Sequence, residues 1–398
     1  MLFFSVIPPK GGIHAFQQAN RNLLGMDTSL RWYDKIEVNK NSLMIFPAKL
    51  TVNLSAIRAN FCLLRARHAK QNIAAVVKAN AYGLGVAAVS AAIWDEGGRE
   101  FFVATLEEAV ELRGVLPQAK IYVFQGIFSG EEAEFTKHRL IPVLNSLEQV
   151  EKYGRGGEIV IHIDTGMTRL GLCETDLSRL PSFHKSQSIL IISHLACANN
   201  PEHPKNIEQL TRLRKALALF PSAKVSFANS SGLFLSEGFH FDLGRPGCAL
   251  YGINPTDGQN PMQQVATLCA PILQIRELDR AETVGYSATY AAQKGSRIAV
   301  VGMGYADGYF RHLSNQGFVY IAGYKSPVLG RVSMDMVAVD VSKIHEAQLS
   351  PETRAEFINA EQTVDDVANQ ANTIGYEVFT RIGQRVKREY VNSVTKSS

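Results

Sequence analysis

The stretch Ile73-Ala74-Ala75-Val76-Val77-Lys78-Ala79-Asn80-Ala81-Tyr82-Gly83-Leu84-Gly85 decides how this chain is interpreted. Its first five residues are apolar and rich in β-branched side chains, which is typical of a buried parallel strand. Lys78 stands where that strand would end. A lysine in an apolar setting shifts toward the neutral, nucleophilic amine that Schiff-base chemistry requires. Alternatively, Lys78 only extends to water, and this segment alone leaves both readings open.

Strand-like apolar runs recur along the chain. Eight of them precede residue 244, namely 73–77, 101–104, 121–124, 140–144, 159–163, 189–192, 224–227 and 239–243. Between most of them, apolar residues stand three and four apart, as in 106–112 and 206–213, which is typical of amphipathic helices. Eight such units predict an α/β fold with an N-terminal (β/α)₈ barrel of the TIM type. A doubly wound sheet is the alternative.

Polar residues follow all eight runs. They are Lys78, Thr105, Gln125, Asn145, Asp164 with Arg169, His194, Asn229 with Ser230, and Arg245. Barrel enzymes build their sites at the carboxyl ends of the strands, so these positions predict one site. The last two loops, 229–232 and 245–248, contain small residues whose backbone N–H groups can surround a phosphate. An imine-forming lysine beside a phosphate site predicts pyridoxal 5'-phosphate as the cofactor. We interpret Asp164 as a turn or capping residue.

The pattern changes on both sides of this region. Residues 1–46 have no sustained period, and we expect a poorly ordered N-terminal extension there, with Met26 and Met44 as alternative start sites. A strand at 49–54 and a helix capped by Ser55 open the cofactor-binding barrel domain, which we place at 47–265. Short alternating runs with glycine turns then predict a C-terminal, mostly β domain at 266–392.

Composition excludes several classes of protein. The chain has 398 residues with 46% hydrophobic and 20% charged residues, and its formal charge of +4 is small and dispersed, so we expect no nucleic-acid partner. No apolar run approaches the roughly 18 residues of a membrane span, so we expect no membrane association. Its five cysteines form no C-x-x-C pair and are expected to be reduced thiols of a cytoplasmic protein without a metal site.

Several motifs together resemble the alanine racemase family. They are Ala75-Val76-Val77-Lys78-Ala79-Asn80-Ala81-Tyr82-Gly83, Asp164-Thr165-Gly166-Met167 with Arg169, Arg245-Pro246-Gly247, Gly285-Tyr286-Ser287-Ala288-Thr289-Tyr290, Gly304-Tyr305-Ala306-Asp307-Gly308 and Ser333-Met334-Asp335. They follow the family's order from about residue 47 to about residue 392. Each motif alone is weak, but the set is specific.

The resemblance implies a homodimer whose sites are each completed by the partner's β domain. It implies that Lys78 holds pyridoxal phosphate covalently and that the cofactor contacts are Lys78, Tyr82, His194, Asn229, Ser230, Arg245, Gly247 and Cys248. Arg245 would face the pyridine nitrogen, and His194 would lie beside the ring. The residues at the substrate would be Arg169, Tyr305 at the entrance and, from the partner, Tyr286 and Met334.

Racemisation explains why the family uses these residue types. A proton must leave one face of Cα and return to the other, so two bases stand on opposite sides of the cofactor. The resemblance assigns these roles to Lys78 and the partner's Tyr286. Because a tyrosine has an ordinary pKa of about 10, it needs a nearby cation, which Arg169 would supply.

Three positions depart from the family pattern. Leu84 stands where many members have histidine, His162 where many have a lysine that becomes a carbamate, and Gln384 where many have a tyrosine near the phosphate. A neutral imidazole cannot replace the negative charge of a carbamate beside Arg169. We therefore hypothesise that a bound anion such as chloride, or another carboxylate, supports Arg169.

The resemblance implies interconversion of L- and D-alanine, supplying D-alanine for peptidoglycan. Two alternatives stay open: a related enzyme acting on other amino acids, either a racemase of broader specificity or a decarboxylase, and a non-catalytic pyridoxal-phosphate-binding protein. The β domain and the Tyr286 motif favour an enzyme, because a carrier needs neither.

Overall fold

A computed structural model describes residues 48–154, 158–180 and 188–392. The predicted extension at residues 1–46 lies outside the described residues. In the part that is described, none of the helices has the length and apolar character needed to cross a membrane.

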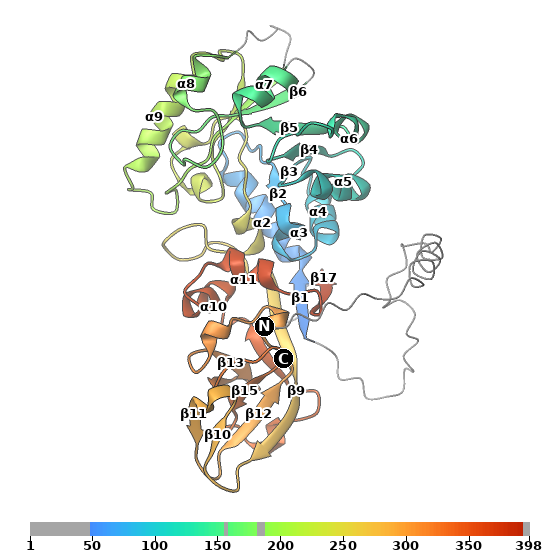
Figure 1. Ribbon diagram of the computed structural model, residues 1–398, viewed down its shortest axis with the longest axis vertical. Coiled ribbons are helices and arrows are strands. Elements are labelled where there is room, and N and C mark those ends of the chain that lie inside the picture. Colours follow the sequence, from blue (N-terminus) through green and yellow to red (C-terminus); the bar gives the residue numbers. More distant parts are fainter. Residues whose placement is uncertain (1–47, 155–157, 181–187, 393–398) are drawn as a thin grey trace, which may run out of the picture. The chain divides into compact units, whose positions relative to one another are not determined.

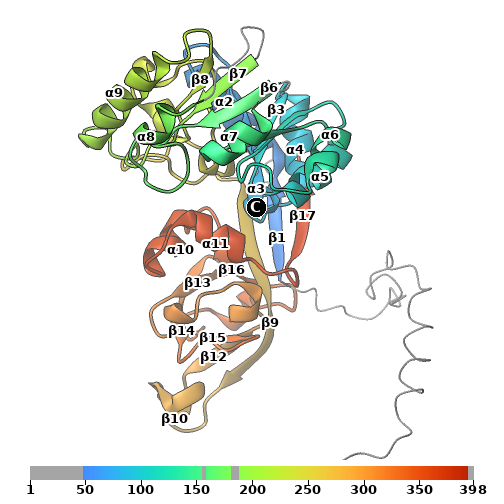
Figure 2. The same ribbon diagram turned by 45° about the horizontal axis from the view of Figure 1, so that its top comes forward.

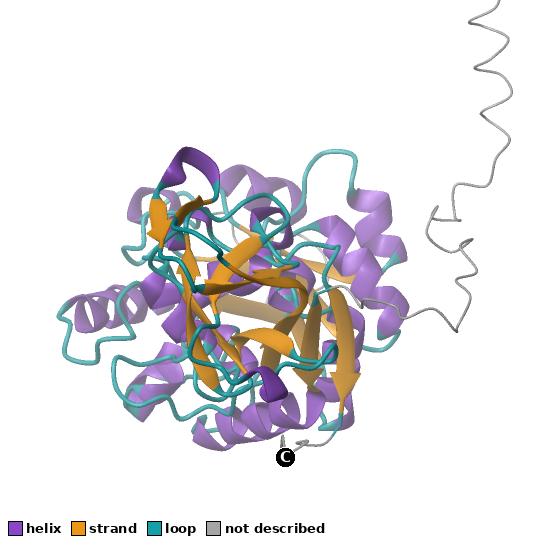
Figure 3. Cartoon of the chain, turned by 90° about the horizontal axis from the view of Figure 1, so that it is seen from below, coloured by secondary structure: helices purple, strands orange, loops and turns teal. Residues whose placement is uncertain are grey.

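The first part of the chain forms a curved, wholly parallel sheet in the order β2-β3-β4-β5-β6-β7-β8. Its strands are β2 (Ala75–Val76), β3 (Glu100–Val103), β4 (Lys120–Val123), β5 (Leu140–Leu144), β6 (Glu158–His162), β7 (Ser188–Ile192) and β8 (Lys224–Ser226). These strands carry almost entirely buried apolar side chains, as expected where helices cover a parallel sheet. In Figure 3, which is seen from below, the strands of the C-terminal part of the chain lie in front of the barrel, and helices surround them in projection.

An irregular segment at 241–246 takes the eighth position and closes the barrel. Gly244 bridges Ile73 beside the first strand, and Arg245 bridges Asn229 after the seventh. The predicted eighth run at 239–243 is therefore displaced, and it forms bridges rather than a regular strand. Phe239 ends a short 3₁₀ turn, and only the residues after it are extended enough to pair on both sides. The predicted barrel is confirmed.

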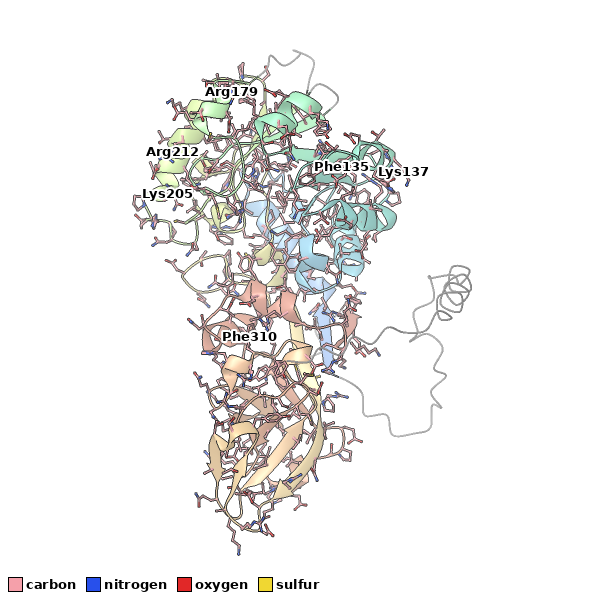
Figure 4. The ribbon with its side chains drawn as sticks, viewed as in Figure 1. Phe135, Lys137, Arg179, Lys205, Arg212 and Phe310 are labelled. Carbon is pink, nitrogen blue, oxygen red and sulfur yellow. The ribbon has the colours of Figure 1, made fainter. Side chains whose placement is uncertain are left out.

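Helices alternate with the barrel strands (Figure 1). They are α2 (Leu54–Arg67), α3 (Lys78–Tyr82), α4 (Val86–Asp95), α5 (Leu106–Val115), α6 (Glu132–Lys137), α7 (Leu147–Tyr153), α8 (Glu174–Leu177) and α9 (Lys205–Leu217). On α9, Leu210 and Leu213 face the core, while Glu208 pairs with Lys205 at 3.1 Å and with Arg212 at 2.5 Å. Figure 4 labels both basic residues on this helix.

The helix that precedes the barrel begins two residues earlier than predicted. Asn53, not Ser55, caps α2, because the Asn53 side chain accepts a hydrogen bond from the Ala56 N–H at 3.1 Å. Both residue types are good caps, so the backbone path out of the preceding strand decides between them.

The C-terminal domain is mostly β, as predicted. An eight-stranded sheet runs β12-β15-β14-β13-β16-β9-β1-β17, with β12 also paired to β9, and β10 and β11 form a separate hairpin. The strands are β9 (Ala266–Glu277), β10 (Glu282–Val284), β11 (Tyr290–Ala292), β12 (Arg297–Val301), β13 (Phe318–Ile321), β14 (Tyr324–Leu329), β15 (Val337–Asp340), β16 (Arg354–Ile358) and β17 (Lys387–Val391). Two short helices, α10 (Val364–Gln370) and α11 (Gly375–Arg381), precede the last strand.

The first described strand, β1 (Lys49–Asn53), belongs to this C-terminal sheet. It pairs antiparallel with β9 and parallel with β17, and Figure 2 shows it between them. The described part of the chain therefore begins in the sheet of the second domain and only then enters the barrel. As a result, α11 and β17 lie close to α3, the segment that carries Lys78.

Candidate active site

A cavity of about 550 Å³ opens at the carboxyl ends of the barrel strands. Its volume lies within the range of about 300–1,000 Å³ common for small-molecule sites. It is lined by Val76, Lys78, Ala79, Tyr82, Ala104, Phe124, Gln125, His162, Arg169, Leu170, Ile192, His194, Asn229, Ser230, Arg245, Gly247, Cys248, Tyr376 and Thr380. All eight residues predicted to contact the cofactor are among them, as is Arg169.

Lys78 begins α3 directly after the first barrel strand. Burial lowers the pKa of its amine, and the positive charge of Arg169 lowers it further, while Glu108 opposes the shift. The amine nitrogen lies 5.9 Å from the centre of the Phe124 ring. The environment thus shifts the amine toward its neutral form, as a lysine with a chemical role requires.

The backbone after Lys78 is left-handed. Ala79, Asn80, Ala81 and Tyr82 all have φ between 51° and 56°, a conformation that costs L-residues roughly 1–2 kcal/mol each. This tight turn places Lys78 and Tyr82 on the same cavity. The Asn80 side chain accepts from the Val86 N–H at 2.7 Å and links the turn to the start of α4.

Small residues from the last two barrel loops, around Ser230 and Gly247, line another part of the cavity. The buried Ser230 hydroxyl accepts from the N–H groups of Gly247, at 2.8 Å, and Ala249, at 3.3 Å. A Cβ atom on Gly247 would lie 2.5 Å from the Tyr82 hydroxyl oxygen, so only glycine fits there. Converging backbone N–H groups and hydroxyls of this kind suit a phosphate.

Arg245 is a buried residue of the cavity wall. Its guanidinium donates to the backbone oxygens of Ser226 and Ser193, which hold it in place. Burial lowers the pKa of Arg245 to about 9, so it stays protonated at neutral pH. The pKa of His194 is lowered by burial and by the nearby positive charge of Arg245, so its imidazole is neutral.

His162 carries no charge at neutral pH. Burial lowers its pKa to about 4, and the positive charges of Arg245 and Arg169 contribute. Its Nδ1 lies 2.8 Å from the Asn145 Oδ1. The amide of Asn145 donates to the Phe124 and Val143 carbonyls, so its oxygen faces the imidazole and His162 donates through Nδ1–H.

Asp164 builds the loop that carries Arg169. Its Oδ1 accepts from the N–H groups of Gly166, Met167 and Thr168 at 2.8, 3.0 and 3.1 Å. The prediction that Asp164 is a turn residue is therefore confirmed. The turn directs Arg169 to the cavity, where its guanidinium lies near Lys78 and His162.

The residues of the cavity fit pyridoxal phosphate. Lys78, Arg169 and Arg245 line it, while the described residues include no Asp or Glu among its walls. The two guanidinium cations of Arg169 and Arg245, without a lining carboxylate, favour a phosphorylated, anionic ligand. The Lys78 amine, whose pKa is lowered, supplies the group that reacts with an aldehyde. The site at Ser230 and Gly247 supplies donors for a phosphate.

The other predicted residues lie elsewhere on the chain. Tyr286, Met334 and Tyr305 do not line this cavity, and 71%, 53% and 37% of their surfaces are exposed. Tyr286 follows β10 in a turn where Gly285 and Ser287 have φ of 74° and 61°. One chain thus brings together the cofactor residues and Arg169, but neither the predicted second base nor the remaining substrate contacts.

Sequence reasoning missed two cavity residues on α11, Tyr376 and Thr380. The Tyr376 ring lies 5.8 Å from that of Tyr82, and its hydroxyl hydrogen-bonds Cys248, so it stands at the predicted phosphate end. Gln384 is not among the described residues that line this cavity, and its correspondence to a family tyrosine near the phosphate stays a prediction. No local pattern could reveal Tyr376, because the docking of α11 against α3 places it there.

The fold and the cavity define a class: enzymes with a (β/α)₈ barrel and a β domain that bind pyridoxal phosphate through a lysine. Residues 52–255 match the alanine racemase N-terminal domain, and residues 265–390 match the alanine racemase C-terminal domain. The chain belongs to the alanine racemase family.

Similar proteins support this assignment over most of the chain. The alanine racemase of Rhodospirillum rubrum is 43% identical over 86% of this chain and 96% of its own, and that of Rhizobium meliloti is 41% identical over 86% and 97%. The structure of the Bartonella henselae alanine racemase with covalently bound pyridoxal phosphate has a TM-score of 0.82 at 38% identity, covering 87% of this chain and 99% of that one. The biosynthetic alanine racemase of Pseudomonas aeruginosa has a TM-score of 0.79 at 36% identity, covering 87% and 99%.

Proposed function

We propose that this protein is a pyridoxal-phosphate-dependent isomerase that interconverts L- and D-alanine by a two-base mechanism. The observation that carries the proposal is a single cavity that holds the partly desolvated Lys78 amine, the guanidinium groups of Arg169 and Arg245, and a small-residue site suited to a phosphate. The general role of such an activity is to supply D-alanine for peptidoglycan, and we place it in the cytoplasm.

Lys78 serves as one base. Burial and the positive charge of Arg169 lower the pKa of its amine, which shifts the nitrogen toward the neutral form that accepts a proton. The cofactor, when bound, withdraws electrons and so makes the proton at the substrate Cα acidic. The lysine stands on one side of the cavity and returns or removes the proton on that face.

Arg245 limits proton transfer at the cofactor's ring. Its guanidinium remains protonated at neutral pH, because its pKa, although lowered by burial, is about 9. If the cofactor's ring nitrogen faced this guanidinium, it would accept a hydrogen bond and would receive no proton. Ser230, Gly247 and Tyr82 would hold the cofactor's phosphate. Asn229, His194 and Cys248 line the same cavity.

Tyr286 serves as the second base from a second copy of the chain. Support comes from its exposure and from its absence among the described residues that line the cavity of its own chain. Met334 is exposed in the same way and meets the substrate carboxylate through its backbone in this proposal, while Tyr305 lines the entrance. A site that lacks one of two bases is incomplete, so we propose that the working enzyme is a homodimer. We also place the boundary between its barrel and β domains near residue 265.

Incubation with L-alanine in D₂O tests the function. The expected result is D-alanine that carries deuterium at Cα. Mass spectrometry detects the deuterium, and chiral chromatography identifies the D-enantiomer. Release of CO₂ with an amine would show a decarboxylase, and bound cofactor without any exchange would show a carrier. Activity on larger amino acids at a similar kcat/KM would show a broader racemase.

A further inference from the structure

Glu108 joins the ends of two neighbouring barrel strands at the rim of the cavity. Its Oε1 accepts from the Ala79 N–H at 2.7 Å, and its Oε2 accepts from the Ala104 N–H at 2.7 Å. Ala79 follows Lys78 after the first strand, and Ala104 follows β3. One carboxylate therefore fixes the peptide next to Lys78 against the adjacent strand.

Glu108 makes contacts other than those expected of a residue in the first turn of its own helix, α5. Thr105 caps α5, and its hydroxyl accepts from the Glu108 N–H at 3.3 Å. In a capping box, a glutamate at this position returns to the N–H of the capping residue. Here the carboxylate instead binds Ala104, one residue earlier, and Ala79, which is distant in sequence.

The segment that Glu108 holds is one that needs external support. Ala79 through Tyr82 are left-handed, and such a conformation persists only where surrounding contacts over-determine it. At the far end of the turn, the Arg388 Nε donates to the Gly83 carbonyl at 3.1 Å. Glu108 provides the corresponding contact at the end where Lys78 stands.

We propose that Glu108 is a positioning residue for Lys78: through the Ala79 N–H it holds the lysine backbone at the place where the amine meets both cofactor and substrate. The inference rests on the function proposed above. Glu108 does not itself line the cavity, and it transfers no proton. It is also the carboxylate that raises the pKa of Lys78 against burial and Arg169.

Two variants separate geometry from charge. Glu108→Gln removes the charge and leaves one acceptor oxygen for two N–H donors. Glu108→Asp keeps the charge, but a side chain shorter by one methylene cannot reach Ala79 and Ala104 together. Glu111→Gln is the matched control, because Glu111 is exposed on the next turn of the same helix.

All three variants are measured as holoenzymes, with kcat expressed per bound cofactor. We expect both Glu108 variants to lower kcat by about 10- to 100-fold with a much smaller change in KM, because a displaced base loses rate rather than substrate affinity. In Glu108→Gln only, the pH midpoint of the cofactor's visible absorbance should move to lower pH, since the charge that favours a protonated Lys78 nitrogen is gone. Glu111→Gln should match the wild type.

Two results overturn the inference. One is a kcat per bound cofactor within about twofold of wild type in both Glu108 variants. The other is a loss of activity that merely follows a loss of bound cofactor or of melting temperature, which indicates a structural role alone. If one variant fails to fold, the other decides. A wild-type protein that binds cofactor but does not racemise refutes the proposed function, while the absorbance midpoints still test Glu108.

Discussion

His162 changes the charge balance around Arg169. The imidazole is neutral at pH 7, because burial and two arginines lower its pKa to about 4. Its Nδ1–H is occupied by Asn145. Lys78, Arg169 and Arg245 therefore share the cavity with no carboxylate among its described lining residues. This arrangement supports the hypothesis that a small anion balances Arg169.

We predict that racemase activity depends on halide. In chloride-free buffer of constant ionic strength, kcat should fall several-fold and recover on addition of chloride, because an anion beside Arg169 strengthens the hydrogen bonds that hold it. Initial rates over a chloride titration measure the effect. The variant His162→Glu brings its own negative charge and should lose the dependence. Equal rates with and without halide in the wild type would refute the hypothesis.

At the scale of elements, the left-handed α3 turn is the unusual feature of the barrel. It is held by Glu108 at its start, by Asn80 within it and by Arg388 at its end. Gly83 follows the turn with φ of 83°, and a Cβ atom there would lie 2.3 Å from the Phe379 carbonyl oxygen on α11. The close approach of α11 to α3 thus depends on a glycine.

Gly83→Ala should destabilise the protein by about 1–3 kcal/mol, because alanine disfavours this φ and its methyl group displaces α11. Chemical unfolding of the holoenzyme measures the change. The matched control is Gly114→Ala in α5, where a Cβ meets nothing within 4 Å. That substitution should be neutral or stabilising by up to about 1 kcal/mol, since alanine is the better helix former. Equal effects of the two substitutions would contradict this account.

At the scale of the whole molecule, one chain brings only one of the two proposed bases to its cavity. Lys78 lines the cavity, whereas Tyr286 is exposed on the C-terminal domain. If the second base comes from another copy, a Lys78 defect on one chain and a Tyr286 defect on the other chain fall in the same site of a mixed dimer. One site then carries both substitutions and the other carries neither.

Mixing two inactive variants should therefore restore activity. Lys78→Ala alone should lose the visible absorbance of the bound cofactor, and Tyr286→Phe alone should keep it and lose mainly exchange with L-alanine. After subunit exchange, random pairing predicts activity near one quarter of wild type, as about half of the dimers have one intact site. Racemisation assays measure the activity of the mixture, and size-exclusion chromatography checks that the chains are dimeric.

The control for this experiment combines Lys78→Ala with the double variant Lys78→Ala and Tyr286→Phe. No mixed dimer of these chains contains Lys78, so the mixture should stay inactive. If the first mixture shows only the sum of its components after confirmed exchange, the two bases belong to one chain and the shared site is refuted.

Local patterns predicted much of the site because it follows the strands. Each barrel strand is an apolar run, and a polar residue follows where the strand ends. Lys78, His194 and Arg245 could therefore be placed at the same end of the barrel from the sequence alone. The small residues at Ser230 and Gly247 indicated the phosphate end in the same way. The displaced eighth strand and the cap at Asn53 show the limit, because backbone path rather than composition decides such positions.

The sequence by itself determined the barrel, the β domain and the chemistry of the strand ends, since these depend on the periodicity and type of neighbouring residues. Only the tertiary structure decided which distant segments meet. It placed β1 in the C-terminal sheet, Tyr376 beside Tyr82, and Glu108 on the peptide after Lys78. The physical reason is that these contacts arise from strand pairing and helix docking between segments far apart in the chain, which no local pattern records.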